Sequence, residues 1–464
     1  MSKENWIHRF GHDLTRTRTR FLPATWLVTL LSLSLPAVSW ADAAKNTAND
    51  ALSFAQVMAN VQQYQQQTSV LPMQQTIATA HVKQSQLWKN PSLTVQQTGF
   101  QSDRDRQVEI GITQPLDLFG QRRSAQQLAQ IGLSQVALNQ QIYQQQSQLA
   151  VKYLWSQVLV LQEEQNVIRA QLVSSQANVD ATRLRYQAGS IAKLDLDRSL
   201  LAHIEIQRQT QQVEQSLQIA KKQLANLWGA ENAHYAVRSP SSLWPVETQQ
   251  SVNQAGQFNL VAQAAKLQEA QQQATLAYLR AKARPNPNVL LGITRSKSAD
   301  LNRTDNQLRL GIEIPLNLFN RQQYAVQVVN AKQQMLQQQQ RGYQQQNLRQ
   351  IETLLLELQG LKQQYDLLNE QQIPLMDQVH RQTLLGFKVG KYAMTDVQQA
   401  SIQLQEQRLK KIQLLKQAWQ KSLIAESLAA GIDPELVMAA DAMLKINQAL
   451  WQSTQELNPV TGAE

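Results

Sequence analysis

The segment Val108-Glu-Ile-Gly-Ile-Thr-Gln-Pro-Leu-Asp-Leu-Phe119 decides the architecture, because it returns 200 positions later as Leu308-Arg-Leu-Gly-Ile-Glu-Ile-Pro-Leu-Asn-Leu-Phe319. In both copies, apolar and polar side chains alternate up to a proline, and a long glutamine-rich helical pattern follows. Alternation with a period of two indicates a strand, and a duplicated unit of this size indicates a fold that places equivalent units side by side. The sequence therefore predicts two copies of one structural unit.

Each copy has a second strand pattern upstream, at residues 91–100 and 288–295, joined to the first by a polar loop. These strands reach the roughly 9 to 11 residues that a transmembrane strand needs, and their charged residues alternate with the apolar ones. A half-buried sheet in a soluble domain is the alternative. Four strands are too few to close a membrane barrel, since the smallest have about 8. Either the sheet is soluble, or several chains pool their strands, and three chains would give twelve.

Most of the remaining sequence is helical in pattern. Apolar residues recur at three- and four-residue steps over residues 121–187 and 322–388, which at 1.5 Å per residue gives helices of about 100 Å. Returning helices are predicted at 195–228 and 396–428, so each pair should form a long antiparallel hairpin. Pro374 is expected to kink or split the second long helix.

Both hairpins turn at a second repeated motif, in which an aromatic residue, a glycine and an aspartate are in register. Arg185-Tyr-Gln-Ala-Gly-Ser-Ile-Ala-Lys-Leu-Asp195 matches Gly386-Phe-Lys-Val-Gly-Lys-Tyr-Ala-Met-Thr-Asp396. Glycine ends one helix in the left-handed conformation, and the aspartate, or Thr395 with Gln398 as a capping box, starts the next. A tight turn needs nothing more. A functional role is indicated by the expected position of both turns at the same far end of a long rod.

Residues 1–41 have the pattern of a secretory signal: a basic start, an apolar stretch and a small-x-small cleavage site at Ser39-Trp40-Ala41. An uncleaved anchor helix is the alternative, but the apolar run is short of the roughly 20 residues that spanning requires. The sequence has no cysteine, which excludes disulfides, thiolate metal sites and a lipidated cysteine. The mature chain is thus predicted to be exported and not lipidated.

Charge and motif content argue against nucleic-acid binding and catalysis. The net charge of +10 falls to +7 without residues 1–41, which hold five basic and two acidic residues, and the excess is spread along helices without interleaved aromatic residues. His81, His203, His234 and His380 are scattered and have no metal-ligand spacing. Phosphate-binding loops and nucleophile elbows are missing as well. We predict a chain that is not an enzyme and has no cofactor.

The order of signal, helix, strand pair, long helix, glycine turn and returning helix, repeated once, resembles the TolC-type outer-membrane efflux family over essentially the whole mature chain. Gln114-Pro-Leu-Asp-Leu-Phe-Gly-Gln-Arg-Arg123 and Pro315-Leu-Asn-Leu-Phe-Asn-Arg321 are most similar to its CzcC-like branch, which serves pumps that export divalent metal cations. The resemblance implies an α+β, mostly α fold. A homotrimer would form a twelve-stranded barrel, four strands per chain, in the outer membrane of a Gram-negative cell. A helical coiled-coil tunnel would continue it through the periplasm.

The resemblance also implies partners: outer-membrane lipid, a periplasmic membrane-fusion adaptor and an RND-type pump in the inner membrane. The residues expected to contact the adaptor are Gly189, Ser190, Ile191, Val389, Gly390 and Lys391. Those expected at the periplasmic gate are Asp195, Phe387, Tyr392, Asp396 and Gln399. Those expected at the junction of barrel and tunnel are Gly111, Pro115, Gly311 and Pro315.

The gate departs from the best-known pattern of the family. Tyr392 stands where an arginine locks the gate, and Gln399 stands where a second acidic ring lies. We therefore expect a gate closed by packing of Phe387 and Tyr392, with one carboxylate ring from Asp396. Asp195 matches a hairpin residue that helps to hold the entrance closed.

The predicted organisation is a signal at 1–41, a first repeat at 42–228, a linker in an equatorial belt at 229–256, a second repeat at 257–430 and a tail at 431–464. The predicted function is the exit duct of a proton-driven tripartite efflux system, exporting divalent cations such as cobalt, zinc or cadmium. One alternative is a channel of the same architecture that serves multidrug efflux or type I protein secretion. The other is a periplasmic coiled-coil adaptor or scaffold with no pore.

Overall fold

The structure is a computed structural model, and it describes residues 51–100, 105–231, 235–240, 242–245, 248–257, 259–298 and 303–455. All of them belong to the compact unit formed by residues 48–464. The predicted signal at 1–41 lies outside the described residues.

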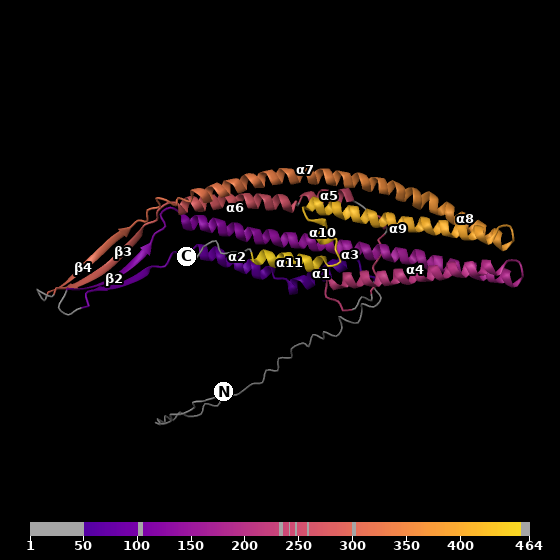
Figure 1. The fold of residues 1–464 in the computed structure, drawn as a ribbon, viewed down its shortest axis with the longest axis horizontal. Coiled ribbons are helices and arrows are strands. Elements are labelled where there is room, and N and C mark those ends of the chain that lie inside the picture. Colours follow the sequence, from indigo (N-terminus) through magenta and orange to yellow (C-terminus); the bar gives the residue numbers. More distant parts are fainter. Residues whose placement is uncertain are drawn as a thin grey trace, which may run out of the picture. The chain divides into compact units, whose positions relative to one another are not determined.

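The chain is mostly helical with one small sheet, and the same series of elements occurs twice (Figure 1). The elements of the first copy are α1 (Phe54–Thr68), α2 (Leu71–Ser85), β1 (Ser92–Thr98), β2 (Arg106–Pro115), α3 (Gln121–Gln187) and α4 (Lys193–Asn226). Those of the second are α5 (Thr248–Gln257), α6 (Leu260–Lys282), β3 (Asn288–Lys297), β4 (Thr304–Glu313), α7 (Gln323–Leu367), α8 (Ile373–Lys388) and α9 (Met394–Ala430). The tail adds α10 (Pro434–Val437) and α11 (Ala442–Gln455).

The two long helices differ in their continuity. The predicted first helix at 121–187 is one unbroken α-helix with these bounds. The predicted second helix is interrupted by a π-helical turn, Leu368–Gln372, directly before Pro374. Because proline has no N–H to donate, one carbonyl of the preceding turn must lose its α-helical bond, and a local π turn accommodates this without ending the helix. Pro374 therefore splits the hydrogen-bond pattern, as expected.

The four strands form one antiparallel sheet in the order β1-β2-β3-β4, so the two copies meet at the β2–β3 pair. The register aligns apolar side chains across all four strands. One row consists of Leu93, Ile112, Leu291 and Leu310, and the next of Val95, Ile110, Ile293 and Leu308. At the crossing of β2 and β3, Gly111 lies opposite Gly292, where an added Cβ on Gly292 would come 3.0 Å from the Ile110 carbonyl oxygen. A Cβ at Gly292 would therefore be crowded by the backbone of β2 at that point.

The main apolar core lies in the middle of α3, where α1, α4 and the tail pack against it. Trp155 of α3 is 5% exposed and meets the ring of Phe54 edge to face, with ring centroids 5.9 Å apart. Tail residues Val437 and Ile446 are each 1% exposed in the neighbouring cluster. These two neighbouring clusters thus anchor α1 and α10–α11 to the middle of α3.

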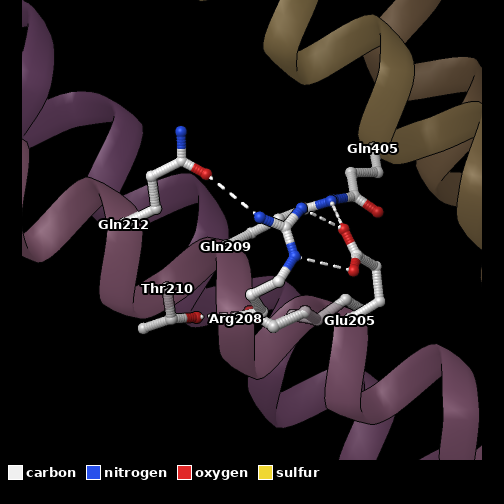
Figure 2. A network of polar contacts seen from close by, with 7 residues as sticks. Glu205, Arg208, Gln209, Thr210, Gln212 and Gln405 are labelled. Atoms are coloured by element: carbon white, nitrogen blue, oxygen red, sulfur yellow. Dashed lines mark hydrogen bonds and ion pairs between the residues drawn. The ribbon is translucent and has the colours of Figure 1, made fainter.

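Polar contacts connect α4 to α9 beyond this core (Figure 2). Gln405 of α9 donates from Nε2 to Oε1 of Gln209 at 3.0 Å, and Gln209 in turn donates to Glu205 at 3.0 Å. Arg208 forks onto Glu205 at 2.6 and 2.9 Å, and these hydrogen bonds lower the pKa of that carboxyl to about 2. The pair is solvent-exposed, so its main effect is to orient Gln209 toward α9.

Candidate functional site: paired hairpin turns and an exposed apolar sheet face

The two turns have the same backbone conformation. Gly189 and Gly390 have φ values of 72° and 81°, the left-handed region that favours glycine. The N–H of Ser190 donates to the Arg185 carbonyl at 2.9 Å, and the N–H of Lys391 donates to the Gly386 carbonyl at 2.8 Å. In both turns this hydrogen bond joins residues five positions apart and satisfies a carbonyl at the end of the helix, α3 in the first and α8 in the second. The repeated motif therefore encodes a repeated turn.

The following helices start two residues before the aspartates. In the second turn, Ala393 is extended at the N-cap, and its N–H donates to Oδ2 of Asp396 at 2.9 Å. The capping box predicted for Thr395 and Gln398 is wrong, because both residues lie inside α9, beyond the position where the cap is made. In the first hairpin, Asp195 lies near the start of α4, and its Oδ1 is 3.9 Å from Nη1 of Arg198. The equivalent aspartates thus have different local partners.

The ends of the two hairpins contact each other through the second turn's aromatic residue. Phe387 is 1% exposed and packs with Met394 and Val397. Arg185, from the first hairpin, stacks over its ring at 4.4 Å and donates from Nη1 to the Phe387 carbonyl at 3.2 Å. The hydroxyl of Thr182 lies 3.3 Å from the Met394 sulfur. The structure therefore brings both turns to one place, and Phe387 lies between them.

The other residues predicted for this end are at the surface. Val389 is 82% exposed, and Gly189, Ser190, Gly390 and Lys391 are exposed as well, whereas Ile191 is half-buried. Of the predicted gate residues, Tyr392, Asp396 and Gln399 are exposed and Asp195 is half-buried. The Tyr392 ring covers Gly386, where an added Cβ would come 2.2 Å from its Cδ2. Phe387 and Tyr392 therefore occupy different environments, one inside the chain and one on its surface.

A buried polar seam, which was not predicted from the sequence, follows α3 toward the turns. Gln171, Ser175, Asn178 and Thr182 are all buried and follow the four-three-four spacing of a coiled-coil core. Gln171 donates to the Ser401 hydroxyl of α9 at 2.8 Å, and Ser175 bonds Nδ1 of His203 in α4 at 2.8 Å. The heptad spacing was the available signal, but glutamine and serine are residues normally found on a solvated face. Near the turns, α3 is thus held by hydrogen bonds as well as by apolar packing.

His380 of α8 is the other buried titratable group in this region. It is 7% exposed, and its Nε2 has no hydrogen-bond partner among the described residues. Burial lowers its pKa, Asp377 opposes that shift and Arg408 of α9 adds to it. Asp377 itself accepts from Arg408 at 3.2 Å and pairs with Arg381. The imidazole is therefore stable here in its neutral form.

The stability of the second hairpin is expected to depend on pH through His380. A histidine whose pKa is lowered by folding binds fewer protons in the folded chain, so stability falls as the pH drops below the unfolded value of about 6.5. Melting followed by circular dichroism between neutral and mildly acidic pH should show a smaller loss for His380→Gln than for the unsubstituted chain. The His81→Gln variant on α2 is the control. Equal acid sensitivity in both variants contradicts this role.

The junction between sheet and helices differs in detail between the copies. β2 ends at Pro115, and β4 ends at Glu313, two residues before Pro315, while Gly111 and Gly311 lie inside the strands. Asp117 caps α3 by accepting the N–H groups of Gln121 and Arg122 at 2.8 and 2.9 Å. Its counterpart Asn317 instead donates to the Ala283 carbonyl at 3.0 Å. The two junctions thus differ both in where the strand ends and in whether the side chain at position 117 or 317 caps the following helix.

The sheet exposes an apolar face. The eight side chains of the two apolar rows defined above are each at least 51% exposed, and Ile312 of β4 adds a further 69% exposed residue. The opposite face carries Glu109 and Arg309, equivalent positions of the two copies, which form an ion pair. A contiguous exposed patch of this kind is uncommon on the surface of a soluble monomer. The face is therefore a candidate surface for contact with lipid or with another protein.

The described residues lack two kinds of feature. No described helix is both long and apolar enough to cross a bilayer. No three histidine, aspartate or glutamate side chains come together there in a way that could hold a metal ion.

Comparisons with known proteins agree with this architecture. The family model described as outer membrane efflux protein matches residues 73–230. No curated protein matches the sequence. The outer membrane protein VceC of Vibrio cholerae superposes with a TM-score of 0.62 at 15% identity, covering 81% of this chain and 96% of that one. The CmeC outer membrane channel of Campylobacter jejuni superposes with a TM-score of 0.60 at 12% identity, covering 95% of this chain and 98% of that one.

A third similar structure, the open state of the MtrE outer membrane channel of Neisseria gonorrhoeae, gives a TM-score of 0.53 at 15% identity, covering 82% of this chain and 90% of that one. At these identities the structures establish a shared fold. With the partial family match, they support the outer membrane efflux family, whose description is that of efflux proteins and not of enzymes.

Proposed function

We propose that this chain forms the outer-membrane exit duct of a tripartite efflux system. The observation that carries the proposal is the exposed apolar face of the four-stranded sheet, with polar side chains on the other face. Apolar side chains outward and polar side chains inward are the arrangement of a strand wall between lipid and water. The partial match of residues 73–230 to a family described as outer membrane efflux protein supports the same compartment.

The internal repeat supports assembly as a closed ring. Within one chain, copy one meets copy two through β2–β3 and through contacts of α3 with α6. Repeating that contact would join β4 and α7 of one chain to β1 and α2 of the next, which uses the two sheet edges left open here. Exposed apolar residues are available on both helices: Met73, Ile77, Tyr324, Val328 and Met335. Three chains close the ring as a homotrimer of twelve strands.

The paired hairpin turns are the proposed periplasmic entrance. Their tips, residues 189–191 and 389–391, are exposed except for the half-buried Ile191, and they are available to an adaptor that couples the duct to an RND-type pump. The duct itself needs no chemistry, since opening is a shift between two states that an adaptor biases by contacting one of them better. Phe387 contributes by holding the two hairpins of one chain together, and Asp195, Tyr392, Asp396 and Gln399 would line the entrance.

Asp396 is proposed to form a carboxylate ring that favours cations at this entrance. The Asp396→Asn substitution retains a side-chain oxygen that can accept from Ala393 but removes the charge, so it should lower cation selectivity and leave the helix start intact. Asp396→Ala should also lose the cap, at a cost of about 1 kcal/mol. Reversal potentials in planar bilayers measure the selectivity. Unchanged selectivity in the asparagine variant would rule out the ring.

The proposed substrates are divalent metal cations, on the likeness of residues 114–123 and 315–321 to the CzcC-like branch. Multidrug efflux or protein secretion by the same architecture is the second candidate. Deleting the gene in a strain with no substitute channel, then testing zinc, cobalt and cadmium beside a drug panel, separates them. Unchanged metal tolerance removes the metal assignment.

The duct itself is tested by purified protein in planar bilayers and by cell fractionation. We expect recovery in the outer membrane and discrete conductance steps. A protein found only in the soluble periplasmic fraction, with no conductance, overturns the proposal in favour of a scaffold without a pore.

A further inference from the structure

The two faces of the sheet differ in the charged side chains that they carry. In a strand, alternate residues share a face, and directly opposite partners in neighbouring strands share it too. Arg295 lies opposite Val108, and Lys297 opposite Arg106, so all of these belong to the face that carries the apolar rows. The other charged strand residues, Glu109, Asp305, Arg309 and Glu313, belong to the opposite face. The apolar face thus holds three basic residues and no acidic one within the described strands.

The three basic residues, Arg106, Arg295 and Lys297, adjoin the end of the apolar rows nearest the strand-connecting loops. Arg106 lies four residues beyond Ile110, about 13 Å along β2 at the usual rise. Arg295 shares a cross-strand row with Val108. Their position marks a boundary at which an apolar environment would give way to a polar one.

All three are exposed, and no carboxylate among the described residues pairs with any of them. Arg106 donates from Nη2 to Oε1 of Gln97 at 3.3 Å, an uncharged partner. Arg106 is directly opposite Lys297, and like charges at directly opposite positions destabilise a strand pair. Arg295 adds a third positive charge one row away. An anion bound between them would remove this repulsion.

We propose that Arg106, Arg295 and Lys297 form a binding site for the phosphate of anionic lipid headgroups, in the leaflet at the loop end of the sheet. The inference rests on the proposed function, because it requires the apolar face to meet lipid. Guanidinium groups bind phosphate oxygens through paired N–H donors, and basic residues beside an anionic surface are attracted to it. The site would fix how deeply the sheet is seated in the membrane.

The test uses the purified, assembled protein in neutral detergent micelles containing phosphatidylcholine and phosphatidylglycerol. Native mass spectrometry measures the ratio of the two lipids retained. The unsubstituted protein should be enriched in phosphatidylglycerol, and the triple variant Arg106→Gln, Arg295→Gln, Lys297→Gln should lose about tenfold or more of that preference. A second arm adds soluble glycerol phosphate as a competitor.

The matched control removes three unpaired, exposed cations from the helices, with Lys83→Gln, Lys332→Gln and Arg341→Gln. It should keep the preference. Equal enrichment in the triple variant and the unsubstituted protein overturns the site, as does full displacement of lipid by glycerol phosphate, which would indicate a free-phosphate site. If conductance and outer-membrane recovery are normal in either case, the proposed duct stands and only the lipid site fails.

Discussion

A lysine in place of Leu310 is expected to keep the chain out of the outer membrane. Leu310 is 73% exposed and lies in the row that runs across all four strands through Leu291 and Ile112. A lysine on a lipid-facing position costs roughly 2 to 4 kcal/mol near the midplane, and a trimer would carry it three times. Outer-membrane recovery, measured by fractionation and immunoblotting, should fall sharply.

The matched control is Gln307→Lys, on the same strand but on the face that carries Glu109 and Arg309. If the polar face meets water, that substitution should be tolerated. A periplasmic scaffold without a pore predicts that Leu310→Lys is tolerated as well, because the lysine would then only replace exposed apolar surface with a charge. Equal recovery of both variants therefore contradicts a membrane-spanning sheet.

The Phe387→Ala substitution is expected to loosen the end of the helical hairpins. It removes a fully buried ring, the stacking partner of Arg185 and the packing of Met394, and aromatic-to-alanine changes in a core cost about 3 to 5 kcal/mol. Because the ring connects the two turns, the loss should raise basal conductance in planar bilayers. Phe387→Leu, which keeps an apolar side chain, should give an intermediate value.

The repeat supplies the control for this prediction. Tyr186 occupies the equivalent position in the first turn but is 39% exposed, so Tyr186→Ala should change stability by about 0.5 kcal/mol or less. A matching increase in conductance for both variants would show that the motif position, and not the burial of Phe387, controls closure.

Local periodicity made most of the fold predictable. The bounds of α3 follow from a helical pattern that continues through Gly132 and stops at Gly120 and Gly189, and the strand pairs follow from alternation that stops at Pro115 and Pro315. These signals lie within a few residues of the structure that they specify. The returning helices were placed to within about two residues for the same reason.

What the sequence did not reveal depends on residues far apart in the chain. Tyr186 and Phe387 look equivalent in the motif, but only Phe387 is covered, because Arg185 reaches it from the other hairpin. Gln171 resembles a solvated glutamine until Ser401 is placed beside it. Likewise, the motif alone could not show that Asp396, and not Thr395, satisfies the backbone at the start of α9. Burial and partner choice at the candidate site are properties of the assembled hairpins.

The π turn at Leu368–Gln372 lies in the copy that is one residue longer. Gly189 follows Phe119 by 70 positions, whereas Gly390 follows Phe319 by 71, so the second copy holds one more residue between the same two landmarks. In a continuous α-helix that residue would rotate everything beyond it by about 100° and advance it by about 1.5 Å. A π turn takes up a single inserted residue locally. The π turn can therefore accommodate the extra residue of the second copy while Arg185 still contacts Phe387.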